Sequence, residues 1–262
     1  MKCFLQRLAF YTPGVDDWDA AQKIFQGQST YKKNEVEQKY KPASLERNEA
    51  RRATNITRLA FRLVESIASD EEIDLSKIGS VFASSGGDYE IFHKTCEILT
   101  TDQKYISPTD FHNSVHNAPS GYWSIASQSH LSSISVAGFD HTFSQALVEA
   151  IIHITVEQRP VLLVCYDIAP AYPISEQRKI ATPFGVAMLL SEKSCKKDLA
   201  EFSIHVEQVK KPTDLETKSF CDLLNENPIA RSLPLLESIA LNRTSRIALE
   251  GTPGVVVDVK CL

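Results

Sequence analysis

The sequence lacks the features that define several common functional classes. No stretch approaches the roughly 18 apolar residues of a membrane span, and residues 1–10 are too short and too polar for a signal peptide. The formal net charge of −5 leaves no basic excess of the kind that a general nucleic-acid binder presents. We therefore expect a cytoplasmic protein that spans no membrane and binds no nucleic acid.

The cysteines lack any recognisable spacing motif. No Cys-x-x-Cys pair occurs, and nothing in the sequence indicates export, so we expect reduced thiols. The six cysteines stand at positions 3, 96, 165, 195, 221 and 261.

The length allows one large α/β core or two fused lobes. The chain has 262 residues, of which 43% are hydrophobic, whereas a typical domain has about 100 to 200 residues. We favour one compact unit over residues 1–262, although residues 193–262 have no clear assignment.

Strand-like and helix-like segments alternate along the chain, which is typical of an α/β fold. A strand near residues 3–10 precedes a short helix at 16–26, and the polar span 29–41 is expected to be an exposed excursion. Ser44 can cap a long helix that reaches about residue 69. The later segments are strand 78–83, turn 84–87, helix 88–100, a helix from 108 to 117, strand 131–137, helix 142–157, strands 161–165, 186–190 and 202–209, helices 214–224 and 234–241, and strand 255–259.

The segment from Ile106 to Glu149 is the most informative part of the chain. Small residues at 118–121 are expected to let the backbone pass close to a neighbour. Ile and Val then alternate with Ser over residues 131–137, as in a short strand, and Gly138 permits a sharp turn into the next helix. Many enzymes expose a catalytic Ser or Cys at such a turn. No cysteine occurs between Ser127 and Glu149, so the segment predicts an elbow without a nucleophile.

Two pairs of residues near this elbow allow a catalytic or a structural interpretation. His112 and His116 are four residues apart and would share a helix face, as metal ligands do. No Glu follows His112 and no third ligand is evident, so we expect hydrogen bonds to neighbouring loops and no metal. Asp140 and His141 suggest an acid-base pair, but adjacent side chains seldom face each other. Asp140 is more simply the cap of the helix that begins near Thr142.

Two other features have similar alternatives. Gly86-Gly87 before a helix resembles a phosphate-binding loop, but no Lys-Ser or Lys-Thr pair follows, so a packing turn is expected. Tyr122 and Trp123 are suited to stacking on a ligand, although an aromatic pair in an apolar segment usually belongs to the core.

The residues around the elbow carry a resemblance to a known family. Residues 114–126 (SVHNAPSGYWSIA), followed by 133–137 (SISVA), are similar to the N-terminal half of β-ketoacyl-acyl-carrier-protein synthases, which have the thiolase fold. Residues 8–14, with Trp18 and 25–27, resemble the first strand, Pro-Gly turn and helix of a ketosynthase.

The resemblance is strongest to chain-length factors, the short ketosynthase-like proteins of aryl polyene gene clusters. Residues 136–140 (VAGFD) and 162–167 (LLVCYD) have close counterparts there. The similarity covers about residues 3–192 and is weak afterwards. It implies an α/β, thiolase-like fold that is truncated relative to a full ketosynthase, with a mixed sheet covered by helices.

Departures from the ketosynthase pattern imply a subunit without catalytic activity. The family's acylated Cys aligns with Gly138, and the family's two His residues have no counterpart, because only His205 lies beyond helix 142–157 and no His-Gly pair exists. The resemblance then implies a chain-length factor without cofactor or metal, which forms a heterodimer with a catalytic ketosynthase and meets acyl carrier protein only indirectly.

The resemblance also assigns positions to this role. Side chains that limit the acyl tunnel are expected at Phe111, Ser114, Val115 and Asn117. The strand that pairs antiparallel with the partner's is expected at Ser132, Ser133, Ile134, Ser135 and Val136.

Two alternatives remain open at this point. One is a thiolase-fold enzyme with altered chemistry, such as malonyl decarboxylation or thioester hydrolysis, using His112, His116 or Asp140. The other is a docking module for an acidic carrier protein, whose basic patch would come from Arg47, Arg51, Arg52 and Arg58. These arginines equally fit the solvated face of a helix.

Overall fold

The computed structural model describes residues 1–34, 39–69 and 73–262. In these residues eight strands form one sheet in the order β3-β2-β4-β5-β1-β6-β8-β7. β2 runs parallel to β3 and β4, and the other neighbours are antiparallel, so the sheet is mixed as expected. The strands are β1 (Lys2–Tyr11), β2 (Gly79–Ala83), β3 (Ser133–Val136), β4 (Val161–Asp167), β5 (Phe184–Ser191), β6 (Ala200–Glu207), β7 (Ser245–Leu249) and β8 (Gly254–Cys261).

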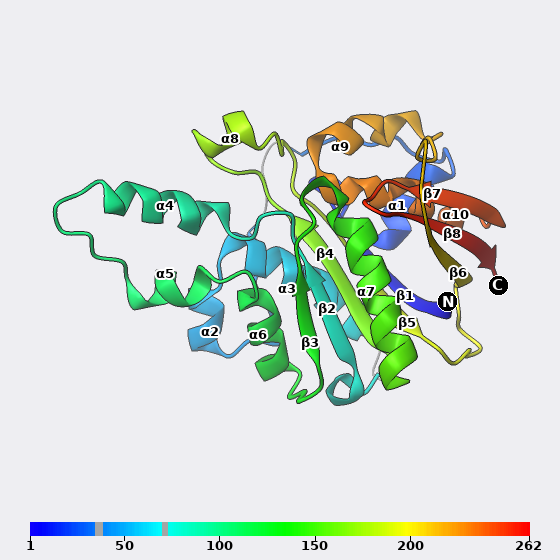
Figure 1. Ribbon diagram of the computed structural model, residues 1–262, viewed down its shortest axis with the longest axis horizontal. Helices are drawn as coiled ribbons and strands as arrows, with labels where there is room; N and C mark the ends of the chain where they lie inside the picture. Colours follow the sequence, from blue (N-terminus) through cyan, green and yellow to red (C-terminus); the bar gives the residue numbers. More distant parts are fainter. Residues whose placement is uncertain (35–38, 70–72) are drawn as a thin grey trace.

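Helices pack on both faces of this sheet (Figure 1). α3 and α6 contribute to one buried cluster, in which the rings of Phe61 and Trp123 lie 6.2 Å apart. α1, α7 and α10 contribute to the cluster on the opposite face. The α-helices are α1 (Trp18–Phe25), α2 (Arg47–Arg52), α3 (Asn55–Ala68), α4 (Tyr89–Leu99), α5 (Pro108–Asn113), α6 (Ala118–Ala126), α7 (Thr142–Glu157), α8 (Ile174–Gln177), α9 (Cys221–Glu226) and α10 (Leu233–Ala240).

Short 3₁₀ helices complete the fold: η1 (Leu75–Lys77), η2 (Phe139–His141), η3 (Lys218–Phe220) and η4 (Pro228–Ser232). No helix in the described ranges is long and apolar enough to cross a bilayer. The polar span 29–41 contains no helix or strand where it is described, and residues 35–38 lie outside the described residues.

The central strands follow the sequence pattern closely. Every residue of β4 and β5 is buried, because helices cover both faces at these positions. The continuous apolar runs at 161–165 and 186–190 therefore predicted these strands correctly.

The prediction of a single helix from Ser44 to about residue 69 is wrong. Ala53 is extended, so the segment divides into α2 and α3, with Thr54 at the N-cap position of α3. Ser44 caps no helix and donates from its hydroxyl to the Glu65 carboxylate at 2.5 Å. The Arg58 guanidinium stabilises the link between α2 and α3. It donates hydrogen bonds to the backbone carbonyls of Ala53 (3.0 Å), Tyr40 and Ala50.

The helix expected from 108 to 117 is also shorter than predicted. α5 ends at Asn113, and residues 118–121 form the first turn of α6. Pro119 is tolerated there because the backbone N–H groups of a first helical turn have no hydrogen-bond partner within the helix. Gly121 does not serve a close approach, because a Cβ there would meet nothing within 4 Å.

The C-terminal residues extend the same sheet. β6 and β8 appear as strands close to the expected segments, but β7 was not predicted, and the helix expected at 214–224 begins only at η3 and continues as α9. The C-terminal strands β6, β8 and β7 thus extend the sheet beyond β1.

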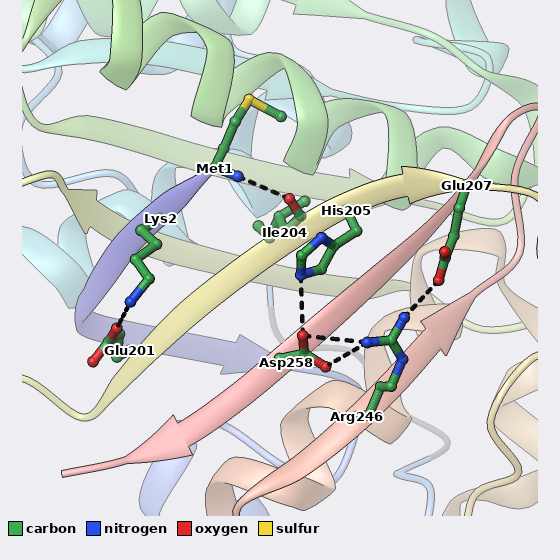
Figure 2. A network of polar contacts seen from close by, with 8 residues as sticks. All are labelled: Met1, Lys2, Glu201, Ile204, His205, Glu207, Arg246 and Asp258. Carbon is green, nitrogen blue, oxygen red and sulfur yellow. Dashed lines mark hydrogen bonds and ion pairs between the residues drawn. The ribbon is translucent and has the colours of Figure 1, made fainter.

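A polar face accompanies these added strands. A His205 ring nitrogen lies 3.0 Å from the Asp258 carboxylate, and Arg246 donates to Asp258 (3.2 Å) and to Glu207 (2.8 Å), as Figure 2 shows. The amino terminus of Met1 donates to the Ile204 carbonyl at 3.0 Å. Paired charges of this kind suit a sheet face that lies in water.

Candidate functional site

The elbow lies between β3 and α7, as the sequence predicted, but its turn is made differently. Gly138 has an ordinary φ of −137°, whereas Phe139 adopts the left-handed region at φ 52°. The Thr142 hydroxyl accepts from the Gly138 amide at 3.0 Å and donates to the Phe139 carbonyl at 2.7 Å. The sharp turn therefore does not need glycine at position 138.

Steric crowding gives Gly138 another reason to be glycine. A Cβ at this position would overlap the Gln145 side chain and lie 3.2 Å from the Thr142 Cα. The elbow consequently leaves little room for any side chain at position 138.

Asp140 does not cap α7, so this prediction is wrong. Asp140 lies inside the η2 turn that precedes the helix, and the N-cap residue of α7 is His141, whose side chain makes no capping hydrogen bond. Instead the Asp140 carboxylate pairs with Arg178 at 2.5 Å and with Arg231 at 3.5 Å. The Arg178 guanidinium also lies 3.9 Å from the centre of the Phe139 ring.

These groups line a hollow of about 300 Å³ in front of the elbow. Sequence reasoning missed Arg178 and Arg231, because nothing local connects them to Asp140. The charged side chains that line the hollow are those of Asp140, Arg178, Lys179 and Arg231. None of its lining residues carries a thiol or a hydroxyl group that could act as a nucleophile.

The nearest cysteines on either side of the elbow in the sequence, Cys96 and Cys165, lie on other elements. Cys165 is in β4 and fully buried, and burial raises the pKa of its thiol well above the ordinary value. Cys96 is exposed on α4. His205 lies in β6, which four strands separate from β3.

A buried polar contact joins two strand ends next to the elbow. Asp167, at the end of β4, is fully buried and accepts from the Ser84 hydroxyl (2.8 Å) and the Ser85 amide (2.9 Å) after β2. Burial raises the pKa of Asp167 to about 6, although both serines lower it. The sequence contained a signal for this contact, because parallel strands end at the same edge of a sheet.

The two histidines of the predicted pair have separate partners. A His116 ring nitrogen lies 2.9 Å from the Ser84 carbonyl, and the His112 ring packs edge-on against Tyr122. Groups of three or more potential metal ligands are absent from the described residues. Gly86 and Gly87 form a packing turn as expected, in which Gly87 has a φ of 69° and lies close to His116.

An apolar groove runs along α5 and α6. Phe111 is 70% exposed, and Val115 and Ile125 are also exposed. Together with Asn117 they line a hollow of about 390 Å³, whereas Ser114 is exposed outside the lining and donates to the Phe111 carbonyl at 2.8 Å. Tyr122 and Trp123 are buried beneath the groove, as expected of core residues.

The edge strand β3 lies beside this groove. In the described part of the chain it pairs only with β2, so its outer edge carries no strand. Ser133 is exposed, Ser132 and Ile134 to Val136 are partly buried, and the Ser135 hydroxyl lies 3.2 Å from that of Ser120 on α6.

Three of the four arginines considered for a carrier-protein docking patch border one hollow. Arg47 and Arg51 line a hollow of about 990 Å³ together with Lys39 and Lys41. Arg58 also borders it, but its guanidinium is used by backbone carbonyls. Arg52 is exposed and is not part of the lining.

Comparison with known proteins identifies the family. The model of the beta-ketoacyl synthase N-terminal domain matches residues 18–250. No curated protein matches the chain.

Solved structures share the fold at low sequence identity. A chain of the ketosynthase (ApeO) in complex with its chain length factor (ApeC) from Xenorhabdus doucetiae is 20% identical, with a TM-score of 0.70 over 99% of both chains. A chain of the ishigamide ketosynthase/chain length factor is 10% identical, with a TM-score of 0.74 over all of both chains. A β-ketoacyl synthase from Burkholderia phymatum is 12% identical, with a TM-score of 0.60 over 90% of this chain and 70% of that one. These matches confirm the thiolase-like fold, and the family match shows that the chain belongs to the β-ketoacyl synthase N-terminal domain family.

Proposed function

We propose that this chain is a non-catalytic, ketosynthase-like subunit that pairs with a catalytic β-ketoacyl-ACP synthase and limits the length of the acyl chain. The observation that carries the proposal is the apolar groove of α5 and α6, which lies beside an unpaired edge strand. In an isolated chain the apolar groove and the unpaired strand edge would both be exposed to water, which is unfavourable and promotes aggregation. A partner subunit would cover both.

The elbow supports the proposed lack of catalytic activity. Gly138 stands where the resemblance aligns the family's acylated Cys, and Gln145 and Thr142 crowd the space that its side chain would need. His205, which is the only candidate for a family His beyond α7, lies on the surface within hydrogen-bond distance of Asp258. Covalent acyl transfer needs an activated nucleophile, and the elbow has none.

The partner is expected to pair with β3. Residues 132–136 would bind the equivalent strand of the ketosynthase antiparallel and continue the sheet across the dimer. The ketosynthase from Xenorhabdus doucetiae, named as a complex with its chain length factor, is a precedent for such a pair. Acyl carrier protein would then deliver substrate to the partner's active site and meet this chain indirectly.

The groove supplies the tunnel wall in this arrangement. Phe111, Val115 and Asn117 line it, and Ser114 lies on the same segment. An acyl chain that grows toward these side chains would stop where they fill the space, because occupied volume excludes further methylene groups.

The basic hollow favours an alternative to this indirect role, in which carrier protein docks directly on this chain. Lys39, Lys41, Arg47 and Arg51 bring four cationic groups together on a chain whose net charge is −5. An acidic carrier protein would be attracted to this surface despite the overall charge of the chain.

An enzyme with altered chemistry receives less support. His116 is hydrogen-bonded to the Ser84 carbonyl and Asp140 is held by two arginines, so neither is presented to a thioester. Substituting His112, His116 or Asp140 and assaying the isolated chain for thioester turnover separates this alternative from the main proposal.

Coexpression with a Cys-containing ketosynthase tests the main proposal. We expect the two chains to elute together in size-exclusion chromatography, with condensing activity in the complex and none in this chain alone. A covalent acyl adduct on the isolated chain would contradict the proposal.

A further inference from the structure

A hollow of about 240 Å³ lies along the first turns of α3. Three of its lining residues are spaced three and four apart and share one face of the helix: Asn55, Arg58 and Arg62. Tyr11 of β1, Lys39 and Tyr40 also line it. Lys39 and Arg58 border the basic hollow as well, so the two hollows are adjacent, whereas Arg62 lines this α3 hollow alone.

Arg62 is held between two aromatic rings. Its guanidinium carbon lies 3.8 Å from the centre of the Tyr11 ring and 5.6 Å from the centre of the Tyr40 ring. One nitrogen donates to the Asp16 carboxylate at 2.7 Å, which uses only one of the N–H donors of the group. The Arg62 side chain is 19% exposed and that of Asp16 is 73% exposed. A carboxylate so exposed pairs weakly, so Arg62 stays available to another anion.

Arg58 brings a positive charge that no carboxylate of the described residues compensates. Its Nε and both Nη atoms donate to the backbone carbonyls of Ala53, Tyr40 and Ala50, which are neutral acceptors. Each Nη atom keeps one further N–H donor. Arg58 is only partly exposed, so its charge is partly desolvated. An anion in the hollow would compensate this charge.

The loop that carries Tyr40 is anchored to α3, so the hollow is preformed. The Glu65 carboxylate accepts from the hydroxyls of Tyr40 and Ser44, each at 2.5 Å. It also accepts from the backbone amides of Ala43 at 3.1 Å and Ser44 at 2.8 Å. These donors occupy Glu65, which does not line the hollow.

The charges of the lining favour a phosphate group over a carboxylate. Lys39 adds a third cation, and no Asp or Glu of the described residues lines the hollow. Glu90 lies outside the lining and accepts from the Asn55 side-chain amide at 2.9 Å. A phosphate monoester carries about −1.5 to −2 charges at neutral pH, which suits several cations better than a single negative charge does. Two guanidinium groups also match the geometry of phosphate oxygens.

We propose that the α3 hollow binds the phosphate group of a small molecule through Arg58, Arg62 and Lys39. The hollow of about 240 Å³ has room beside that group for a short organic part, since a water molecule takes up roughly 30 Å³ in the liquid. The volume therefore favours a phosphate monoester over inorganic phosphate. Binding requires neither the ketosynthase subunit nor the carrier protein.

Isothermal titration calorimetry of the full chain tests the site with glycerol 3-phosphate, inorganic phosphate and acetate. At about pH 8 and 0.15 M salt, where both phosphates are mostly dianions, we expect a Kd of about 1 mM or lower for glycerol 3-phosphate. Weaker binding of inorganic phosphate would support a monoester as the ligand, and equal binding would support the phosphate group alone. Binding of neither phosphate, or binding of acetate as tight as that of the phosphates, overturns the proposal.

Two lysines provide a matched pair of variants. Lys39 and Lys41 are both exposed, but Lys41 lines only the basic hollow. We expect Lys39→Gln to weaken binding of glycerol 3-phosphate about threefold or more, and Lys41→Gln to leave it unchanged. Equal losses in the two variants would mean that the phosphate binds elsewhere on the basic surface, which overturns the proposal.

Arg62→Gln tests the group that lines the α3 hollow alone. It is expected to weaken binding about tenfold or more, because a charge-assisted contact to phosphate is lost. Circular dichroism establishes that the variant is folded, and the lysine pair decides the question if it is not. Unchanged affinity in a folded Arg62→Gln chain overturns the proposal.

Discussion

The buried carboxylate of Asp167 accepts a hydrogen bond from the Ser84 hydroxyl at 2.8 Å, and this contact ties the end of β4 to the end of β2. The second oxygen of Asp167 has no hydrogen-bond partner among the described residues. The contact therefore joins two parallel strands next to the elbow while leaving a charge only partly compensated.

Stability is expected to fall as pH rises through the titration of Asp167. The unfolded carboxyl has a pKa of 3.8, and burial raises the folded value to about 6, against the hydrogen bonds from Ser85 and Ser84. Between these values the folded chain holds a proton that the unfolded chain has lost, so the free energy of unfolding decreases with rising pH. Asp167→Asn should therefore raise this free energy by ~1–3 kcal/mol at pH 8 and have little effect at pH 4.

Urea unfolding of both chains from pH 4 to 8 measures this difference. Asp74→Asn is the control, because hydrogen bonds from Lys77 and Ser76 lower the pKa of that exposed carboxyl instead. The slope between pH 4 and 6 should persist in the control. A stabilisation by Asp167→Asn that does not depend on pH would contradict the assignment.

Crowding at Gly138 predicts a cost for any side chain there. Gly138→Ala is expected to lower the free energy of unfolding by ~1–3 kcal/mol, as overpacking does in a tight site. Gln145→Ala would remove the flexible obstacle but leave the Thr142 Cα in place. The double variant should therefore recover part of the loss, and a double-mutant cycle measures the coupling. Additive effects of the two substitutions would argue against a direct contact.

The elements that sequence reasoning predicted well are those with strong local signals. β4 and β5 are continuous apolar runs, and α7 repeats apolar residues at helical spacing. The break at Ala53 was missed because α2 and α3 are both helical in pattern and only Thr54 marks the start of the second helix. An N-cap residue inside a helical pattern was the available signal.

The parts of the site that could not be predicted depend on distant residues. Arg178 is 38 positions from Asp140, and the turn between Val136 and Thr142 brings the two together. A local rule assigned Asp140 to the helix cap because that contact needs no information from the rest of the chain. The apolar segment of α5 and α6 was predicted by family resemblance, whereas the exposure of Phe111 became visible only in three dimensions.

Shortening the side chain at Phe111 is expected to lengthen the product. Phe111→Ala removes an exposed ring from the groove, so the complex should make longer acyl chains or a broader distribution of lengths. The free energy of unfolding should change by no more than about 0.5 kcal/mol, because the ring is on the surface. Mass spectrometry of the products of the coexpressed complex provides the measurement. Val206→Ala, at an exposed apolar position of β6 outside the groove, is the control. Unchanged products in Phe111, Ser114 and Val115 variants would contradict the tunnel role.

Under the alternative of direct docking, reversing charge in the basic hollow is expected to weaken binding of acyl carrier protein. Arg47 and Arg51 line the hollow and are exposed, so Arg47→Glu with Arg51→Glu should not disturb the core. We expect affinity for the carrier protein to fall about tenfold at low salt, and the difference from the unmodified chain to shrink as salt is added. Lys196→Glu with Lys218→Glu, at two exposed positions outside this hollow, is the control with the same change of net charge. Fluorescence anisotropy of a labelled carrier protein measures both variants. Equal losses in the two would mean that overall charge governs the binding, whereas a loss confined to the arginine variant would make the hollow itself the docking surface.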